Sequence, residues 1–122
     1  MDNTKILDEL KRLKFEDFLW ITFAILCIIN VYGDYNDKEF LITKNKIYKD
    51  KSNNIFEITL IVTFLIYLYF LKRNYKFYKK ADFKDKELYS IKVLGNVFLL
   101  MGVICLIYFQ TNQSSFIGSP AL

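Results

Sequence analysis

Residues Phe64–Leu71 read FLIYLYFL, eight apolar side chains in succession. A helix in a water-soluble bundle is expected to be apolar along one stripe only, because its opposite face meets solvent. This run is apolar on every face of a helix, which is typical of a segment surrounded by lipid. Outward from it, the sequence from Ile58 to Leu71 contains no charged residue.

Two further windows, Phe18–Gly33 and Val93–Phe109, also lack charged residues. The hydrocarbon core of a bilayer is about 30 Å thick and is crossed by about 20 predominantly apolar residues in a helix. The three windows reach this length when the flanking interfacial residues are included. The sequence therefore predicts an all-α integral membrane protein with three transmembrane helices.

The windows divide a single membrane domain, residues 1–122, into seven segments. An amphipathic leader is expected to form a helix that lies flat on the inner membrane surface. The outer loop has two short apolar patches, which leaves a short helix and a pair of strands both open. Helices two and three are expected to form a hairpin that extends into the cytoplasm. The segments are the leader 1–17, the spans 18–33, 55–71 and 93–109, the outer loop 34–54, the basic loop 72–92 and the outer tail 110–122.

Lys and Arg are distributed unevenly between these segments. The leader has four and the basic loop eight, while the outer loop has five and the tail none. Because short cytoplasmic loops carry an excess of Lys and Arg, the N-terminus is predicted to be cytoplasmic and the C-terminus outside, in the cell membrane. Cations directly after the second span are expected to meet anionic lipid headgroups of the inner leaflet. They are Lys72, Arg73, Lys76, Lys79 and Lys80.

The composition argues against most catalytic and metal sites. The chain has no histidine, so Ser–His and Cys–His pairs, imidazole-bound zinc and His-ligated haem are excluded. Its two cysteines lie in separate windows, and its four glycines form no phosphate-binding loop. We therefore expect no enzymatic activity, no metal and no cofactor. The net charge of +4 reflects the cytoplasmic bias of the loops and does not indicate nucleic-acid binding.

Polar residues within the windows mark helix contacts or a pathway, because lipid offers them no partner. By helical rise, two of them lie near the inner boundary and three in the outer third. These two layers are expected to pair the first helix with its neighbours. The intramembrane polar residues are Thr22, Asn30, Glu57, Thr59, Thr63 and Asn96.

Glu57 is the one carboxylate within reach of the hydrocarbon. One interpretation is a hydrated boundary residue paired with Lys51. The other is a proton or cation site that faces the neighbouring helices.

Small residues form one face on the first helix and another on the third. We predict that these two faces meet, because small side chains let helix backbones approach closely. Both cysteines belong to the faces and are expected to remain buried free thiols that act as small hydrophobes. The face residues are Ala24 and Cys27 on the first helix and Gly95, Gly102 and Cys105 on the third.

Four runs resemble small, functionally unassigned membrane proteins of low-GC Gram-positive bacteria. They are Tyr32–Asp34, Leu88–Gly95, Cys105–Gln110 and Phe116–Leu122. The resemblance implies a bacterial plasma-membrane protein with three helices and carries over no activity. The size also resembles that of bacteriocin self-immunity proteins.

The leading hypothesis is a non-enzymatic protein that binds a partner in the bilayer, either as an accessory subunit or as an immunity-type factor. The partner is a membrane protein or a second copy, and Tyr67, Tyr69 and Phe70 are placed for such contacts. An alternative is an oligomeric conduit for ions or small solutes that uses Glu57 and Asn30. A third hypothesis, an enzyme acting on lipid, is suggested by the position of Asp34, Asp37 and nearby lysines. The tail is expected either to fold back over the bundle or to present a short motif.

Overall fold

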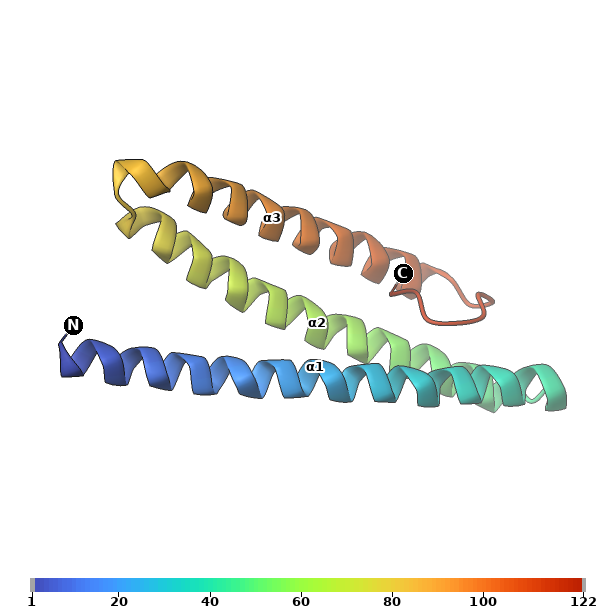
Figure 1. Cartoon of the computed structure of the whole chain (residues 1–122). Coiled ribbons are helices and arrows are strands. Elements are labelled where there is room, and N and C mark those ends of the chain that lie inside the picture. The colour runs from blue at the N-terminus through green and yellow to red at the C-terminus, as the bar shows by residue number, and fades with distance from the viewer. Residues whose placement is uncertain (1, 122) are drawn as a thin grey trace.

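The computed structural model describes residues 2–121 and contains three long antiparallel helices, with no strand among those residues. In chain order they are α1 (Asn3–Thr43), α2 (Lys46–Lys80) and α3 (Phe83–Asn112), as Figure 1 shows. All three are long and apolar enough to cross a membrane. The predicted all-α class with three such helices is confirmed. Met1 of the leader and Leu122 of the tail lie outside the described residues.

The first helix includes the leader, the first apolar window and the beginning of the expected outer loop. It starts at Asp2, whose Oδ1 accepts a hydrogen bond from the backbone N–H of Thr4 at 3.2 Å. No proline and a single glycine, Gly33, occur along its 41 residues. At 1.5 Å per residue α1 is about 60 Å long, twice the thickness of the hydrocarbon core. The leader therefore continues the axis of the first span and does not form a separate helix (Figure 1).

The expected outer loop, residues 34–54, is helical except for the two-residue turn at Lys44 and Asn45. Lys44 has a left-handed backbone with φ 61° and donates its N–H to the carbonyl oxygen of Phe40 at 2.7 Å. Asn45 caps α2, because its Oδ1 accepts the N–H of Ile47 at 3.1 Å. The two possibilities left open for this loop, a short helix and a strand pair, are thus replaced by extensions of two long helices.

The second turn joins α2 to α3 through Ala81 and Asp82 and completes the predicted helical hairpin. Asp82 occupies the N-cap position of α3, although its side chain makes no capping hydrogen bond. Its backbone carbonyl accepts the N–H groups of Asp85 and Lys86 at 3.0 and 2.9 Å.

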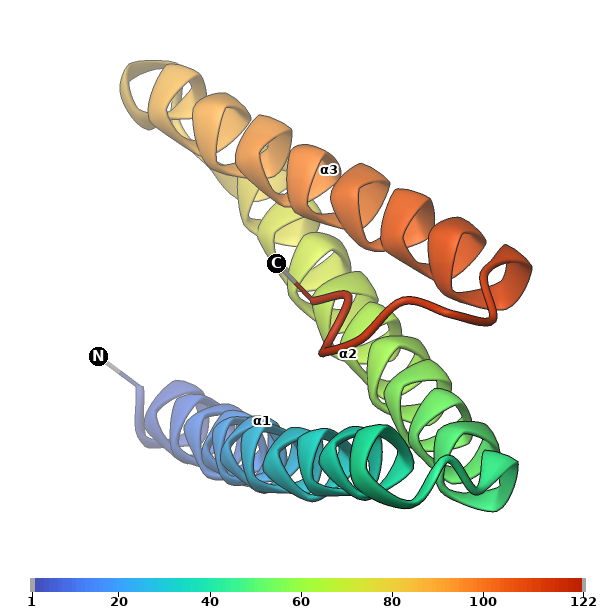
Figure 2. The same cartoon turned by 90° about the vertical axis from the view of Figure 1, so that its right-hand side faces the viewer.

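Helix α2 is the centre of the molecule, with α1 and α3 packed on different sides of it. No Cα atom of α1 lies within 8 Å of a Cα atom of α3 among the described residues. Figure 2 shows α1 and α3 diverging from α2 in an open arrangement. Between α1 and α2 the buried core consists of Leu19, Leu26 and Ile66, with aromatic side chains packed around it.

Most of the apolar surface is left uncovered by protein. Only 11% of the most apolar window of α1 is buried, with 28% for α2 and 11% for α3. Ile28, Ile58 and Phe98 are each more than 60% exposed. Soluble monomers rarely expose apolar side chains to this extent, and lipid is the solvent that suits them.

Helices α1 and α2 come into very close contact at Gly33. A Cβ atom at this position would lie 2.5 Å from Cε1 of Phe56, whose side chain is fully buried. Glycine is therefore required there by space rather than by backbone conformation. This contact was not among those expected from the sequence.

Candidate functional site

Ionic side chains are gathered into two clusters at opposite ends of the bundle. The amino-terminal cluster is built around Glu16, at the end that holds the N-terminus and the α2–α3 turn. The carboxy-terminal cluster is built around Asp37, at the end that holds the α1–α2 turn and the tail. Glu16 and Asp37 are twenty-one residues apart on α1, or about 32 Å by helical rise. This separation matches the thickness of a hydrocarbon core, so each cluster suits one membrane boundary.

In the amino-terminal cluster, Glu16 is 5% exposed and joins α1 to α2. Its two oxygens accept hydrogen bonds from Arg12 at 3.0 Å, Arg73 at 2.8 Å and the Tyr69 hydroxyl at 3.1 Å. Arg12 also binds Glu9 at 2.6 Å. The hydrogen bond to the Glu9 carboxylate, with a smaller contribution from Glu16, raises the pKa of Arg12 above its ordinary value. This guanidinium therefore stays charged at any physiological pH.

The cluster continues through amides to α3. Arg73 donates two hydrogen bonds to Oδ1 of Asn74, at 2.9 and 3.1 Å. Asn74, which is almost fully buried, donates in turn to Oδ1 of Asn96 on α3. Within the expected inner polar layer, Asn96 therefore pairs with α2 and not with the first helix. Thr22, the other residue of that layer, donates to the carbonyl of Phe18 in its own helix at 2.9 Å.

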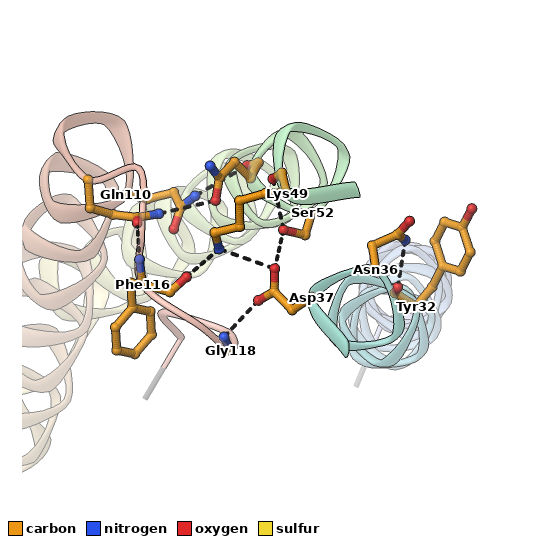
Figure 3. A network of polar contacts seen from close by, with 10 residues as sticks. Tyr32, Asn36, Asp37, Lys49, Ser52, Gln110, Phe116 and Gly118 are labelled. Atoms are coloured by element: carbon orange, nitrogen blue, oxygen red, sulfur yellow. Dashed lines mark hydrogen bonds and ion pairs between the residues drawn. The ribbon is translucent and has the colours of Figure 1, made fainter. Parts of the chain in front are cut away.

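In the carboxy-terminal cluster, Asp37 and Lys49 form a fully buried ion pair between α1 and α2 (Figure 3). The Asp37 Oδ1 to Lys49 Nζ distance is 3.1 Å, and the Ser52 hydroxyl donates to the same oxygen. The other carboxylate oxygen accepts the backbone N–H of Gly118 at 2.8 Å. Lys49 also donates to the carbonyl of Phe116. Asp37 thus holds two helices and the tail at once.

The tail folds back over the bundle, which was one of the two expected possibilities. Its path begins at Gln113, whose Nε2 donates to Oδ1 of Asn53 at 3.3 Å. Phe116 packs edge-on against Phe109 with ring centroids 5.3 Å apart. Gly118 then takes a positive φ of 103°, a conformation that glycine adopts without steric penalty. In Figure 2 the tail runs from α3 back across the bundle.

A groove lies between α1 and α3, with α2 as its floor, in the apolar zone between the two clusters. Its volume is about 280 Å³, and the end of the tail closes it on one side. The side chains that line it include Leu26, Cys27 and Asn30 of α1, Thr63 and Tyr67 of α2, Leu106 of α3 and Ala121 of the tail.

The outer polar layer contains one hydrogen bond between helices. The Thr59 hydroxyl donates to Oδ1 of Asn30 at 3.1 Å and so joins α2 to α1. Thr63 donates to the carbonyl of Thr59 at 2.8 Å. Glu57 is half-buried and makes no hydrogen bond or ion pair within residues 2–121. Lys51 is directed instead to Tyr32, with its Nζ 5.1 Å from the ring centroid.

The small-residue faces do not meet, because α2 separates α1 from α3. Gly95 and Gly102 have open space where a Cβ would lie, and Ala24 is exposed. Helix α3 turns Leu100, Val103 and Gln110 inward instead. Both cysteines are free thiols, and both are exposed rather than buried as expected. Cys27 lines the groove and Cys105 does not.

The aromatic residues proposed for partner contacts are used inside the bundle. Tyr67, Tyr69 and Phe70 pack against the core between α1 and α2. The ring of Phe70 lies 5.6 Å from that of Trp20, centroid to centroid. They were expected on an outer surface because their position along the chain does not reveal which face of α2 meets α1.

Four of the five cations assigned to lipid headgroups line one cleft of about 270 Å³ at the amino-terminal end. They are Lys72, Arg73, Lys76 and Lys80, which are joined there by Arg12, Tyr69 and Phe77. The fifth, Lys79, lies outside the cleft, with its Nζ 4.8 Å from the ring centroid of Tyr75. The participation of Arg12 was not predicted, because it is 61 residues earlier in the chain than Arg73.

No family model, curated protein or solved structure matches this chain.

Proposed function

We propose that this protein is a non-enzymatic membrane protein that accepts a transmembrane helix of a partner in the groove between α1 and α3. The observation that supports it is the open arrangement of the bundle. Helices α1 and α3 leave an apolar groove at mid-membrane depth that their own side chains do not fill. The partner is either another membrane protein, as for an accessory subunit or an immunity-type factor, or a second copy of this chain.

The groove also offers a specific polar contact. Asn30 accepts the Thr59 hydroxyl with its Oδ1, while its Nδ2 group donates to no residue in the described part of the chain. Helix association in lipid is driven by close packing and by interhelical hydrogen bonds, since the lipid is as apolar as the helices. A carbonyl or hydroxyl on a partner helix would satisfy this donor, at a contribution of about 0.6 kcal/mol.

The proposal includes the orientation of the helices across the membrane. The amino-terminal end carries the basic loop, so it faces the cytoplasm, and the tail lies outside the cell membrane of a bacterium. The hairpin of α2 and α3 then projects beyond the membrane on the cytoplasmic side. Reaction of single cysteines placed at Lys84 and Ser115 with a membrane-impermeant maleimide on intact cells tests this orientation. Labelling at 115 alone agrees with it, and labelling at 84 alone contradicts it.

The two native cysteines allow a matched test of the groove. The C105S variant keeps Cys27 inside the groove, and the C27S variant keeps Cys105 outside it. Each thiol is modified with a benzophenone maleimide in native membranes and irradiated. We expect the C105S variant to give a discrete protein adduct through Cys27, and the C27S variant to give none through Cys105. Adding the Asn30→Leu substitution to C105S should reduce the yield of the Cys27 adduct. Lipid adducts alone from both positions would contradict the proposal.

The alternative function is an oligomeric conduit. It is supported by the polar lining at Asn30 and Thr63 and by the Glu57 carboxylate, which has no partner among the described residues. A Glu57→Gln variant reconstituted in liposomes discriminates between the two proposals. Proton or cation flux that is present in the parent protein and lost in the variant would favour the conduit. Absence of flux from both would favour partner binding.

A further inference from the structure

Three lysines follow one another along α2 without a counter-ion. Lys72, Lys76 and Lys80 are four residues apart, so their side chains lie on one face of the helix and repel one another. None of the three has a carboxylate within 4.0 Å in residues 2–121, where all four ion pairs involve other cations. All three line the amino-terminal cleft together with Arg12. This face of α2 is thus suited to an anion from outside the chain.

Arg12 adds an unused donor on the opposite wall of the same cleft. Its two Nη groups bind Glu9 and Glu16, but its Nε is buried and has no hydrogen-bond acceptor in the described residues. A buried N–H without an acceptor is uncommon and costly. The guanidinium is held in place by the Phe77 ring, 5.1 Å from its carbon to the ring centroid. The guanidinium that lines the cleft is thus already oriented, and it retains an N–H without an acceptor in the described residues.

An apolar groove adjoins the cleft and runs between α2 and α3. Its volume is about 580 Å³, and apart from Lys72 its lining consists of Leu68, Leu71, Tyr75, Val93 and Val97. Lys72 lines both hollows and therefore stands on the ridge between them. A ligand that fills both must carry an anionic group beside a hydrocarbon chain.

The position of the two hollows fits the same ligand. The cationic cleft lies where the uncharged window of α2 ends, and the apolar groove reaches from Tyr75, just beyond that end, to Leu68 and Val97 inside the uncharged windows. Phosphate groups of lipids lie at this depth, with their acyl chains directed inward. Among the described residues no carboxylate lines either hollow, so none is available there to a choline ammonium group.

We propose that this composite site binds one anionic phospholipid. Its phosphate lies among Lys72, Lys76 and Lys80, beside the Arg12 guanidinium, and one acyl chain lies in the groove between α2 and α3. The proposal goes beyond partner binding and does not depend on it, because the two sites lie on different surfaces. It requires only that the helices cross a bilayer.

The test titrates the full chain in detergent with dioleoyl phosphatidylglycerol and with dioleoyl phosphatidylcholine and follows bound lipid by native mass spectrometry. Lys76→Gln removes a charge inside the cleft. Lys79→Gln removes the same charge from an exposed position outside it, three residues further on. We expect K76Q to weaken phosphatidylglycerol binding about fivefold, K79Q to change it less than twofold, and neither to change phosphatidylcholine binding. Equal losses from both variants would show general surface attraction and overturn the site.

Two further measurements separate a lipid from a soluble anion. Val97→Phe fills the apolar groove without altering the cations, and it should weaken phosphatidylglycerol binding several-fold. Glycerol 3-phosphate, which has the phosphate but no acyl chain, should fail to displace the lipid at millimolar concentration. Displacement by glycerol 3-phosphate, together with unchanged binding to V97F, would assign the cleft to a soluble phosphate and contradict the lipid proposal.

Discussion

The Glu16 carboxylate forms ion pairs with the guanidinium groups of Arg12 and Arg73 and accepts a hydrogen bond from Tyr69, all within a nearly closed environment. Removing one partner of such a buried arrangement leaves the others without a counter-charge, which costs more than the pairing itself contributes. Glu9, by contrast, binds Arg12 from an exposed position, with half of its side chain accessible. The two carboxylates therefore provide a direct comparison of a buried and an exposed ion pair.

Replacing Glu16 with Gln is expected to lower the free energy of unfolding by about 3 kcal/mol, because Arg73 then lies partly buried without an anion. Replacing Glu9 with Gln should lower it by no more than about 0.5 kcal/mol, as for other exposed pairs. Thermal unfolding of both variants in the same detergent provides the measurement. Equal effects would contradict the structural role assigned to Glu16.

At the residue scale, the sequence indicates which polar residues lie within the apolar windows, but not which residues most of them contact. Asn30 and Thr59 were placed in one layer because both depths follow from helical rise, and the hydrogen bond between them agrees. Nothing in the sequence distinguishes Glu16, because a charge just before an apolar window resembles an ordinary leader residue. Its partner Arg73 is 57 residues away, and no local spacing indicates such a contact.

At the scale of the elements, all three helices extend beyond the apolar windows that predict them. Charge defines where the hydrocarbon ends, but it does not end a helix; a breaker residue or a cap does that. Residues 34–43 contain no glycine or proline, so α1 continues to Thr43. Asn45, which caps α2, could have been recognised as a candidate cap, but the left-handed Lys44 before it could not.

Close packing of α1 on α2 depends on Gly33. A Gly33→Ala substitution places a methyl group against the Phe56 ring and is expected to lower the unfolding free energy by about 1–3 kcal/mol. The control is Gly102→Ala, at a position with open space, where the higher helix propensity of alanine should leave stability equal or raised by up to about 1 kcal/mol. Chemical or thermal unfolding in detergent distinguishes them. If G102A lowered the unfolding free energy more than G33A, the result would favour the prediction that the small-residue faces of α1 and α3 meet.

The tail is fastened by Asp37, so its order should depend on that carboxylate. Asp37→Asn removes the charge that balances buried Lys49 and weakens the acceptor for Gly118. Amide hydrogen exchange in residues 113–121 is expected to accelerate about a hundredfold, equivalent to about 3 kcal/mol. Asp50→Asn removes an equal charge from an exposed residue at the same end and should leave the exchange unchanged. Slow exchange in D37N would show that the tail is held by other contacts.

For the molecule as a whole, the predicted class and the three spans follow from uncharged windows that no soluble surface could tolerate. The open arrangement does not follow from them, because every face of an all-apolar helix is equally suited to lipid. Contacts between Gly33 and Phe56 and within the two ionic clusters select which faces pack on α2. These are long-range contacts, so the sequence pattern alone left the order of packing undetermined.

The claim on which the whole account depends is that lipid surrounds the zone between the two ionic clusters. Trp20 is the only tryptophan, is 61% exposed, and lies four residues beyond Glu16 on α1. In vesicles containing lipids brominated at graded acyl depths, its fluorescence should be quenched most by the shallowest bromines and little by aqueous iodide. Quenching by iodide with no response to any brominated lipid would contradict the account.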